Sequence, residues 1–159
     1  MKKIVVLKAE GDKVETVDYD GYKSISAVTD GLIEHFRDEK IPTPLGNLNA
    51  TLYCNEEGLL REDLKTVNAI ATLLYGQPIY GDVAVLKDLG DGDDTGFEYK
   101  EEENDGVKEE TICECWFVED AFMLAINGNK DKLAELHKQY DDNKPEPFIM
   151  VTSMDDMEK

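Results

Sequence analysis

Basic residues, cysteines and long apolar runs are all scarce in this chain, and each shortage excludes a class of protein. Among 159 residues, 17 are Lys or Arg and 36 are Asp or Glu, so the formal net charge is −19. Binding to a phosphate backbone requires Lys and Arg, so we expect no direct contact with nucleic acid. No apolar stretch approaches the ~20 residues that cross a bilayer. The apolar run after Lys3 is too short for a secretory signal. We therefore expect a cytoplasmic protein without membrane contact.

The three cysteines, Cys54, Cys113 and Cys115, are too few for a disulfide framework, and their odd number suits a reducing compartment. A zinc site would need Cys54 and a histidine beside the Cys113-x-Cys115 pair. That spacing is tighter than the usual two to four intervening residues. We interpret the cysteines as small buried hydrophobic residues.

Catalytic motifs are missing as well. The sequence contains no G-x-S-x-G, no H-E-x-x-H and no P-loop. Its two histidines are interpreted as a partly buried packing residue, His137, and a surface or sheet residue, His35. Carboxylates are so abundant that no acid–base pair stands out. We expect a protein that is not an enzyme and needs no cofactor.

The most informative stretch is residues 52–86, where a strand, a turn, a helix and a second strand are predicted in succession. Residues 55–58 combine polar side chains with a glycine, which favours a turn. Four apolar residues recur at helical spacing and predict a helix over residues 67–75: Val67, Ile70, Ala71 and Leu74. Gly76 supplies its C-terminal end. Residues 79–85 predict a buried strand with a bend inside it.

The start of the chain predicts two strands, a short helix and a third strand. Residues 4–7 are a continuous run of β-prone apolar residues, typical of a strand covered on both faces. Residues 14–17 predict the second strand. Ser24 is predicted to cap a helix that ends at Gly31. Residues 32–36 predict a strand that pairs with the first strand of the central stretch.

Two segments are predicted to be loops. Residues 41–47 contain two prolines and a glycine. Residues 88–110 carry eleven acidic residues against two lysines, and we interpret them as a mobile acidic insertion. Their carboxylates are the predicted interaction surface: Asp91, Asp93, Asp94, Glu98, Glu101, Glu102 and Glu103.

A calcium-loop register also occurs in the acidic segment. Five residues occupy positions 1, 3, 5, 6 and 12 of such a loop: Asp91, Asp93, Thr95, Gly96 and Glu102. Glu98 stands where a hydrophobic residue normally pairs two loops, and an acid-rich run produces such matches by chance. We therefore expect weak, non-specific cation binding and no dedicated metal site.

Beyond the acidic segment, residues 111–118 predict a strand in which Trp116 is a core anchor. Glu119 and Asp120 suit the start of a helix over residues 121–126.

The remaining C-terminal residues predict a second helix and a last strand. Asn129 caps the helix over residues 131–140, in which four residues share a face: Leu133, Leu136, His137 and Tyr140. Residues 148–152 predict a closing strand, and residues 153–159 a frayed acidic tail. The whole pattern predicts a single α+β domain over residues 1–159, with a small mixed or antiparallel sheet packed with three to four helices.

Four motifs in a fixed order carry a resemblance to a known family. They are Asn-Glu-Glu-Gly at 55–58, Asn68 followed by Ala-Thr at 71–72, Ile-Tyr-Gly-Asp-Val-Ala-Val at 79–85, and Val-Thr-Asp-Gly-Leu-Ile-Glu at 28–34. Over roughly residues 4–87 the chain resembles a family of uncharacterised small proteins common in phages, plasmids and their bacterial hosts. It departs from the family pattern at Thr29 and Asp30, where a glycine is usual, and at residues 65–67, where Leu-Pro usually precedes the asparagine. The resemblance implies a small α+β domain on a mobile element and implies no activity.

A family-type polar site is predicted where the turn and the helix start converge. Its candidate residues are Asn55, Glu56, Glu57 and Asn68. The alternative is that these side chains only shape the turn and cap the helix.

Two functions of different classes follow from these patterns. The first is a small acidic, non-enzymatic interaction protein of a phage or mobile element, which occupies a basic surface of a host protein. By imitating nucleic acid, it would inhibit a host defence or DNA-handling protein. The alternative is a protein that binds or sequesters a small, nucleotide-like ligand in a pocket near Asn55 and Asn68. The charge has a simpler explanation too, solubility in a host with an acidic proteome.

Overall fold

The computed structural model describes residues 2–31, 33–43, 46–55, 57–58, 60–99, 103–104, 107–108, 114–141 and 143–144. These residues form the following elements in chain order: β1 (Lys2–Lys8), β2 (Lys13–Asp18), α1 (Gly21–Thr29), β3 (Ile33–Thr43), β4 (Gly46–Asn55), α2 (Ala69–Tyr75), β5 (Val83–Gly90), β6 (Asp93–Thr95), β7 (Phe97–Glu98), β8 (Glu103–Asn104), β9 (Val107–Lys108), α3 (Glu114–Gly128) and α4 (Lys130–Tyr140). The predicted strand 148–152, the tail 153–159 and Cys113, Glu56, Glu101 and Glu102 lie outside the described residues.

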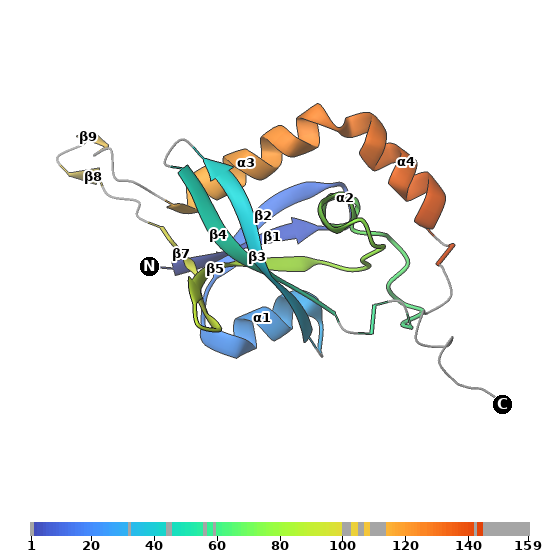
Figure 1. Ribbon diagram of the computed structural model, residues 1–159, viewed down its shortest axis with the longest axis horizontal. Coiled ribbons are helices and arrows are strands. Elements are labelled where there is room, and N and C mark those ends of the chain that lie inside the picture. The colour runs from blue at the N-terminus through green and yellow to red at the C-terminus, as the bar shows by residue number, and fades with distance from the viewer. Residues whose placement is uncertain are drawn as a thin grey trace.

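An antiparallel sheet with the strand order β2-β1-β5-β4-β3 forms the centre of the fold (Figure 1). β1 pairs with β5 over residues 5–7 and with β7 over residues 2–3, while β5 pairs with β6 over residues 87–90. β6 and β7 therefore extend the sheet where β1 and β5 stop pairing with each other. The predicted fold class, a small α+β domain with an antiparallel sheet and helices, is confirmed.

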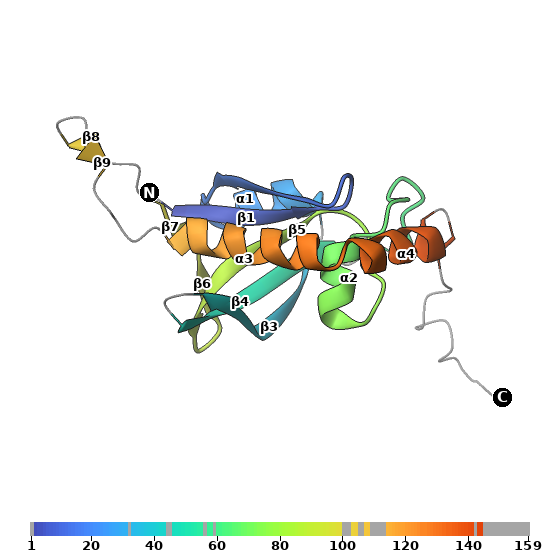
Figure 2. The same cartoon turned by 90° about the horizontal axis from the view of Figure 1, so that it is seen from above.

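Helices cover both faces of the sheet (Figures 1 and 2). On one face, Ile4 and Val6 pack with Ile25 of α1. On the other face, Val5 and Leu7 belong to the larger core, to which three helices contribute: α2, α3 and α4. The prediction of a first strand covered on both sides is confirmed, since residues 4–7 are at most 3% exposed. Burying each such side chain stabilises the fold by roughly 1.5–3 kcal/mol.

The prediction of a loop over residues 41–47 is wrong. β3 and β4 form a hairpin in which Ile41 pairs with Leu48 and Pro42 with Asn47. Proline is tolerated there because β3 is the last strand of the sheet, so the missing N–H costs no ladder hydrogen bond to a further strand. The prediction that β3 pairs with the strand before the turn is confirmed by the register of His35 with Tyr53.

Residues 88–98 do not form the solvated loop predicted for them. They contribute the end of β5, then β6 and β7, to the main sheet. Phe97 is fully buried in the larger core. Gly96 lets the chain pass closely over β1, because a Cβ there would stand 3.0 Å from the Cβ of Lys2 and 2.7 Å from that of Tyr19. Most residues of the segment are polar, but the buried Phe97 and the pairing of β6 with β5 hold it in the sheet.

The prediction of a strand over residues 111–118 is wrong for residues 114–118, which begin helix α3. Cys115, Val118 and Phe122 recur at helical spacing and are the buried residues of that helix. Trp116 points elsewhere and is 40% exposed, so it is not the predicted core anchor. Its ring makes an edge contact with Tyr99, with 6.2 Å between ring centroids. A short apolar run fits a strand and a buried helix equally well, which explains the error.

Three helix starts also differ from the prediction. Asp20, not Ser24, occupies the N-cap of α1, and the Ser24 hydroxyl instead donates to the Gly21 carbonyl at 2.7 Å. α3 begins five residues before Glu119, so the predicted cap residues lie inside it. Asn129 precedes α4 as predicted, but its side chain donates to the Ala125 carbonyl at 2.7 Å and does not cap.

The central helix is confirmed in a shorter form, since α2 begins at Ala69. Val67 lies before it, in a β-bridge with Tyr80. Leu74 is 47% exposed and does not join Ile70 in the core. The helix ends as predicted at Gly76, whose φ of 74° is left-handed.

Candidate functional site

Asn68 is fully buried and binds three separate parts of the backbone. Its Oδ1 accepts the N–H of Ala71 at 3.1 Å, which caps α2. Its Nδ2 donates to the carbonyls of Leu7 at 2.8 Å and Gly81 at 2.9 Å. Asn68 therefore ties the start of α2 to the end of β1 and to the bend before β5.

Asn55 makes a similar clamp at the end of β4. Its Nδ2 donates to the carbonyls of Thr29 at 2.9 Å and Asp30 at 3.1 Å, at the C-terminus of α1. Its Oδ1 accepts the N–H of Glu57 at 2.8 Å, which forms the predicted turn. The contacts of Asn55 and Asn68 are those of turn formation and helix capping, the alternative that the sequence left open.

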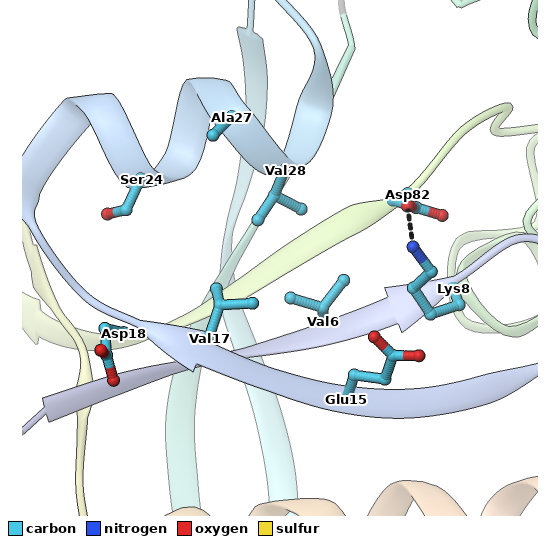
Figure 3. Close-up of a pocket in the computed structure, with 9 residues that line it drawn as sticks. All are labelled: Val6, Lys8, Glu15, Val17, Asp18, Ser24, Ala27, Val28 and Asp82. Carbon is cyan, nitrogen blue, oxygen red and sulfur yellow. Dashed lines mark hydrogen bonds and ion pairs between the residues drawn. The ribbon is translucent and has the colours of Figure 1, made fainter.

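Both asparagines hold the walls of a surface groove that runs beneath α1. Its inner part is a cavity of about 330 Å³ between α1 and the strands β1 and β2. Val6 and Val17 face Val28 of α1 across this cavity (Figure 3). The strand register explains the arrangement, because Glu15 pairs with Val6 and the same alternation places Val17 on the α1 side. Val17 is 36% exposed, so the floor is apolar and open to solvent.

A second cavity of about 760 Å³ continues the groove past the end of α1. The two cavities share four residues: Lys8, Ala27, Val28 and Asp82. Its far wall contains Asp30 and Asp63, which are bridged by the guanidinium of Arg61. Arg61 Nη1 also donates to the Asp30 carbonyl at 2.8 Å. This fork fixes the end of α1 against the 61–63 segment.

An ion pair between Lys8 and Asp82 stands where the two cavities meet (Figure 3). Lys8 Nζ lies 2.7 Å from Asp82 Oδ2, and Asp82 Oδ1 accepts the Ala9 N–H at 3.0 Å. The hydrogen bond that Lys8 donates to Asp82 raises the pKa of Lys8, and the charges of Asp82 and Glu15 add to it. Lys8 thus stays charged and largely satisfied. Sequence reasoning missed this pair, although Asp82 belongs to a family motif and was predicted to form a bend.

The lining of the groove is predominantly acidic. Its charged residues are six carboxylates and two lysines: Glu10, Glu15, Asp18, Asp30, Asp63, Asp82, Lys8 and Lys65. Asp30, Asp63 and Asp82 are engaged with Arg61 and Lys8. Among the described residues, Glu15 pairs with Lys13 at 3.2 Å in an exposed ion pair, which contributes little. Asp18 pairs with Lys3 at 3.4 Å, and because Lys3 also lies over the Tyr99 ring, this pair is on the α3 face of the sheet, opposite Val17.

The predicted acidic interaction surface is divided by the structure. Asp91 and Asp93 are exposed at the tip of the β5–β6 hairpin. Asp94 instead accepts hydrogen bonds from the hydroxyls of Thr51, at 2.6 Å, and Tyr53. Glu98 lies beside Lys2, at 4.0 Å. The backbone of Glu103 lies in β8.

The residues of the calcium register that are described do not converge on a cation site. Asp93 and Thr95 belong to β6, where they pair with Gly90 and Lys87 of β5. Among the residues that the structure describes, no group of three or more His, Cys, Asp or Glu side chains is placed to hold a metal ion. Cys54 and Cys115 are buried in the larger core. No helix within the described ranges is long and apolar enough to cross a membrane.

His137 is partly buried, as predicted, but its contacts are polar. Its Nε2 lies 2.7 Å from Asp12 Oδ1 and its Nδ1 lies 2.9 Å from Asp141 Oδ2. Asp141 in turn accepts the Val67 N–H at 2.8 Å. Burial lowers the pKa of His137, but hydrogen bonds to Asp12 and Asp141 outweigh it and raise that pKa above its ordinary value. This cluster joins the β1–β2 turn to α4.

The fold and the groove together define a small α+β protein with an acidic, amphipathic surface cavity. The domain of unknown function DUF3846 matches residues 1–104, so the chain belongs to that family. The resemblance to an uncharacterised family is thereby confirmed. The match includes α1, α2 and both walls of the groove, whereas α3 and α4 follow it. No curated protein and no solved structure matches the chain significantly.

Proposed function

We propose that this protein is a small acidic interaction protein, not an enzyme, which occupies a basic site on another protein. The observation that carries the proposal is the formal net charge of −19 in 159 residues. A net charge of magnitude about 2–8 is sufficient to keep a small domain soluble. So large a negative potential speeds the encounter with a basic surface and repels nucleic acid and other anions.

Two parts of the described surface support this function. The tip of the β5–β6 hairpin presents Asp91 and Asp93 beside Leu89, which is 57% exposed. The groove beneath α1 presents Glu15 beside the open apolar floor. Carboxylates next to exposed apolar side chains suit a protein partner, which buries both kinds of surface.

The family resemblance supports a setting for this activity. The resemblance implies a protein of a phage or plasmid, so the partner that we propose is a host defence or DNA-handling protein in the cytoplasm. Its basic nucleic-acid site would be occupied by an acidic surface that imitates the nucleic acid.

A binding assay with rising salt tests the proposal. The chain is titrated against a panel of basic DNA-binding proteins, and we expect binding to at least one of them, with an affinity that falls steeply as salt rises. Asp91→Asn with Asp93→Asn should weaken that binding. The matched control is Asp131→Asn with Glu135→Gln, which removes the same charge from exposed positions of α4. No salt-sensitive binding to any member of the panel would refute the function.

The alternative, a nucleotide-like ligand, is less well supported by the groove. Asn55 and Asn68 direct their amides to backbone groups and line neither cavity. The lining carries six carboxylates against two lysines, which disfavours phosphate groups. Calorimetry with nucleotides separates the two functions, because only the alternative predicts heat of binding.

A further inference from the structure

We infer that the edge of β2, together with the groove beneath α1, is the docking site for an extended segment of the partner protein. The segment joins the sheet as a further strand beside β2 and places one apolar side chain in the groove. The inference rests on the proposed function and specifies how the partner is bound. Two independent observations carry it, the outward backbone groups of β2 and the apolar channel along the same edge.

β2 is the last strand at one side of the main sheet, and among the residues that the structure describes it pairs only with β1. The Tyr19 N–H donates to the Lys2 carbonyl at 3.0 Å and continues the register of the two strands. Because hydrogen-bonded pairs alternate along an antiparallel ladder, residues 13, 15 and 17 also direct their backbone to β1. The outward residues of β2 are therefore Val14, Thr16 and Asp18, whose N–H and C=O groups point to the open edge. An added strand binds such a row of groups.

The side chains of β2 place the groove along the same edge. Lys13, Glu15 and Val17 share the α1 face, since alternate residues of a strand point to opposite sides. Val17 is 36% exposed there and forms an apolar channel with Val6 and Val28 (Figure 3). In an added strand, the residue opposite Val17 has its Cβ about 4.5–5.5 Å from that of Val17 and also points toward α1. An apolar side chain at that position enters the channel and covers its floor.

The charges of β2 determine which segment fits and which kind of protein carries it. Lys13 and Glu15 lie on one face with opposite charges, and their own ion pair, at 3.2 Å, is exposed and weak. Cross-strand neighbours of opposite charge are favourable, so we expect an acidic residue opposite Lys13 and a basic residue opposite Glu15. A second copy of the chain is disfavoured because each copy carries a net charge of −19. The occupant is therefore a segment of the basic partner.

A peptide titration followed by amide hydrogen exchange tests the assignment. The probe is acetyl-Thr-Val-Thr-Lys-Val-Glu-amide. In antiparallel register its first valine lies opposite Val17, its lysine opposite Glu15 and its glutamate opposite Lys13. One short strand binds weakly, so millimolar peptide is used. At saturating peptide we expect the amides of the outward residues to exchange at least about ten-fold more slowly, whereas the amides between them, which are already bonded to β1, should change less.

Two N-methylated forms of the probe are matched controls, since they differ only in which edge of the peptide is blocked. Methylation of the second threonine, which lies opposite Thr16, removes a donor that faces β2. It should weaken binding about ten-fold, as expected for loss of a hydrogen bond. Methylation of the lysine, whose N–H points away from β2, should leave the affinity within about two-fold of the parent probe.

Variants of the protein locate the site. Thr16→Pro removes an outward donor from an edge strand, where proline is tolerated, and should abolish binding of the probe. Ala27 is an exposed residue of α1 that lines the groove, so Ala27→Trp should fill the channel and weaken binding several-fold. Ala134→Trp makes the same change at an exposed position of α4 and should leave binding intact. Far-ultraviolet circular dichroism verifies that each variant is folded.

The outcomes distinguish this inference from the proposed function. If the probe does not protect the outward amides, or if its two methylated forms bind alike, the edge assignment is overturned while salt-sensitive binding of a basic protein still stands. Protection of those amides in the free chain also overturns it, because a second copy, detected by sedimentation velocity, or residues 148–152 would then occupy the edge. Loss of partner binding in Ala27→Trp, with retention in Ala134→Trp, supports both proposals. If no basic protein binds, the function fails whatever the peptide does.

Discussion

Replacing Asn68 should destabilise this protein more than replacing any exposed polar residue. Asn68→Ala removes the cap of α2, at a cost of about 1 kcal/mol. It also removes the donor to two carbonyls, those of Leu7 and Gly81. A buried polar group left without a partner costs about 1–3 kcal/mol. Since Asn68 is fully buried, water cannot replace the amide in place. The lost cap and at least one unsatisfied carbonyl together give an expected loss of at least about 2 kcal/mol in the free energy of unfolding.

Asn68→Asp separates the cap from the donor contacts. The aspartate keeps an oxygen for the Ala71 N–H but turns a second oxygen toward the two carbonyls. Burial and these carbonyls raise the pKa of the new carboxyl group above its value in the unfolded chain. The unfolded state then binds fewer protons than the folded state, so the stability of this variant relative to the native chain should decrease as pH rises. At low pH the protonated carboxyl can donate to one carbonyl, which restores part of the loss.

Urea unfolding followed by circular dichroism measures both effects. Asn127→Ala is the control, because Asn127 is exposed on α3 and its replacement should change stability by less than about 0.5 kcal/mol. The reasoning is refuted if Asn68→Ala is no more destabilising than Asn127→Ala. If the difference in the free energy of unfolding between Asn68→Asp and the native chain does not change with pH, the account of the donor contacts is refuted, but that of the helix cap is not.

Two further predictions concern other parts of the fold. Phe97→Ala should lower the free energy of unfolding by about 3–5 kcal/mol because the ring is fully buried. The control is Leu89→Ala on the exposed hairpin, which should lower it by less than about 0.5 kcal/mol in the same urea experiment. Equal effects would contradict the placement of β7 in the core. For His137→Gln, the raised pKa of His137 means that its stabilising contribution is complete below its unfolded pKa of about 6.5 and is lost as pH rises through the folded pKa. The stability difference from the native chain should therefore be larger at about pH 6 than at about pH 9, and a constant difference would exclude the charged contact with Asp12 and Asp141.

The elements that the sequence predicted well are those with an unambiguous local pattern. Residues 4–7 are all apolar, so both faces of the strand are apolar and burial on both faces is expected. Gly76 ends α2 because a left-handed residue closes the last helical turn. Gly31 and the family resemblance predicted that residues 32–36 pair with the strand before the turn, although the pairing extends further than the sequence indicated.

The wrong secondary-structure predictions arise where the average composition of a segment was used and the spacing of individual residues was not. Residues 88–98 are rich in carboxylates, but a single buried ring at Phe97 places β7 beside β1. Residues 115–118 are apolar throughout, and neither strand nor helix is favoured until the spacing is extended to Phe122. Charge and hydropathy averages do not contain this information.

The candidate site was unpredictable for a different reason. Its central ion pair joins Lys8 and Asp82, which are 74 residues apart and meet only because β1 and β5 pair. The fork of Arg61 on Asp30 likewise spans 31 residues. The sequence alone identifies the motifs that contain Asp30 and Asp82, but it does not show which cations these carboxylates pair with.

Asn55 and Asn68 do not line the groove but form hydrogen bonds to backbone groups of residues that do. Asn55 binds the carbonyls of Thr29 and Asp30, and Asn68 binds that of Gly81, all three of which line the larger cavity. One asparagine therefore fixes the α1 wall and the other fixes the wall beside Asp82. Buried side chains that hold both walls of one cavity fit a binding role more closely than solubility alone, since solubility requires charge on the surface but no defined groove. If the groove binds a partner, Asn55 and Asn68 maintain its geometry in this chain, and the exposed residues around it determine what enters.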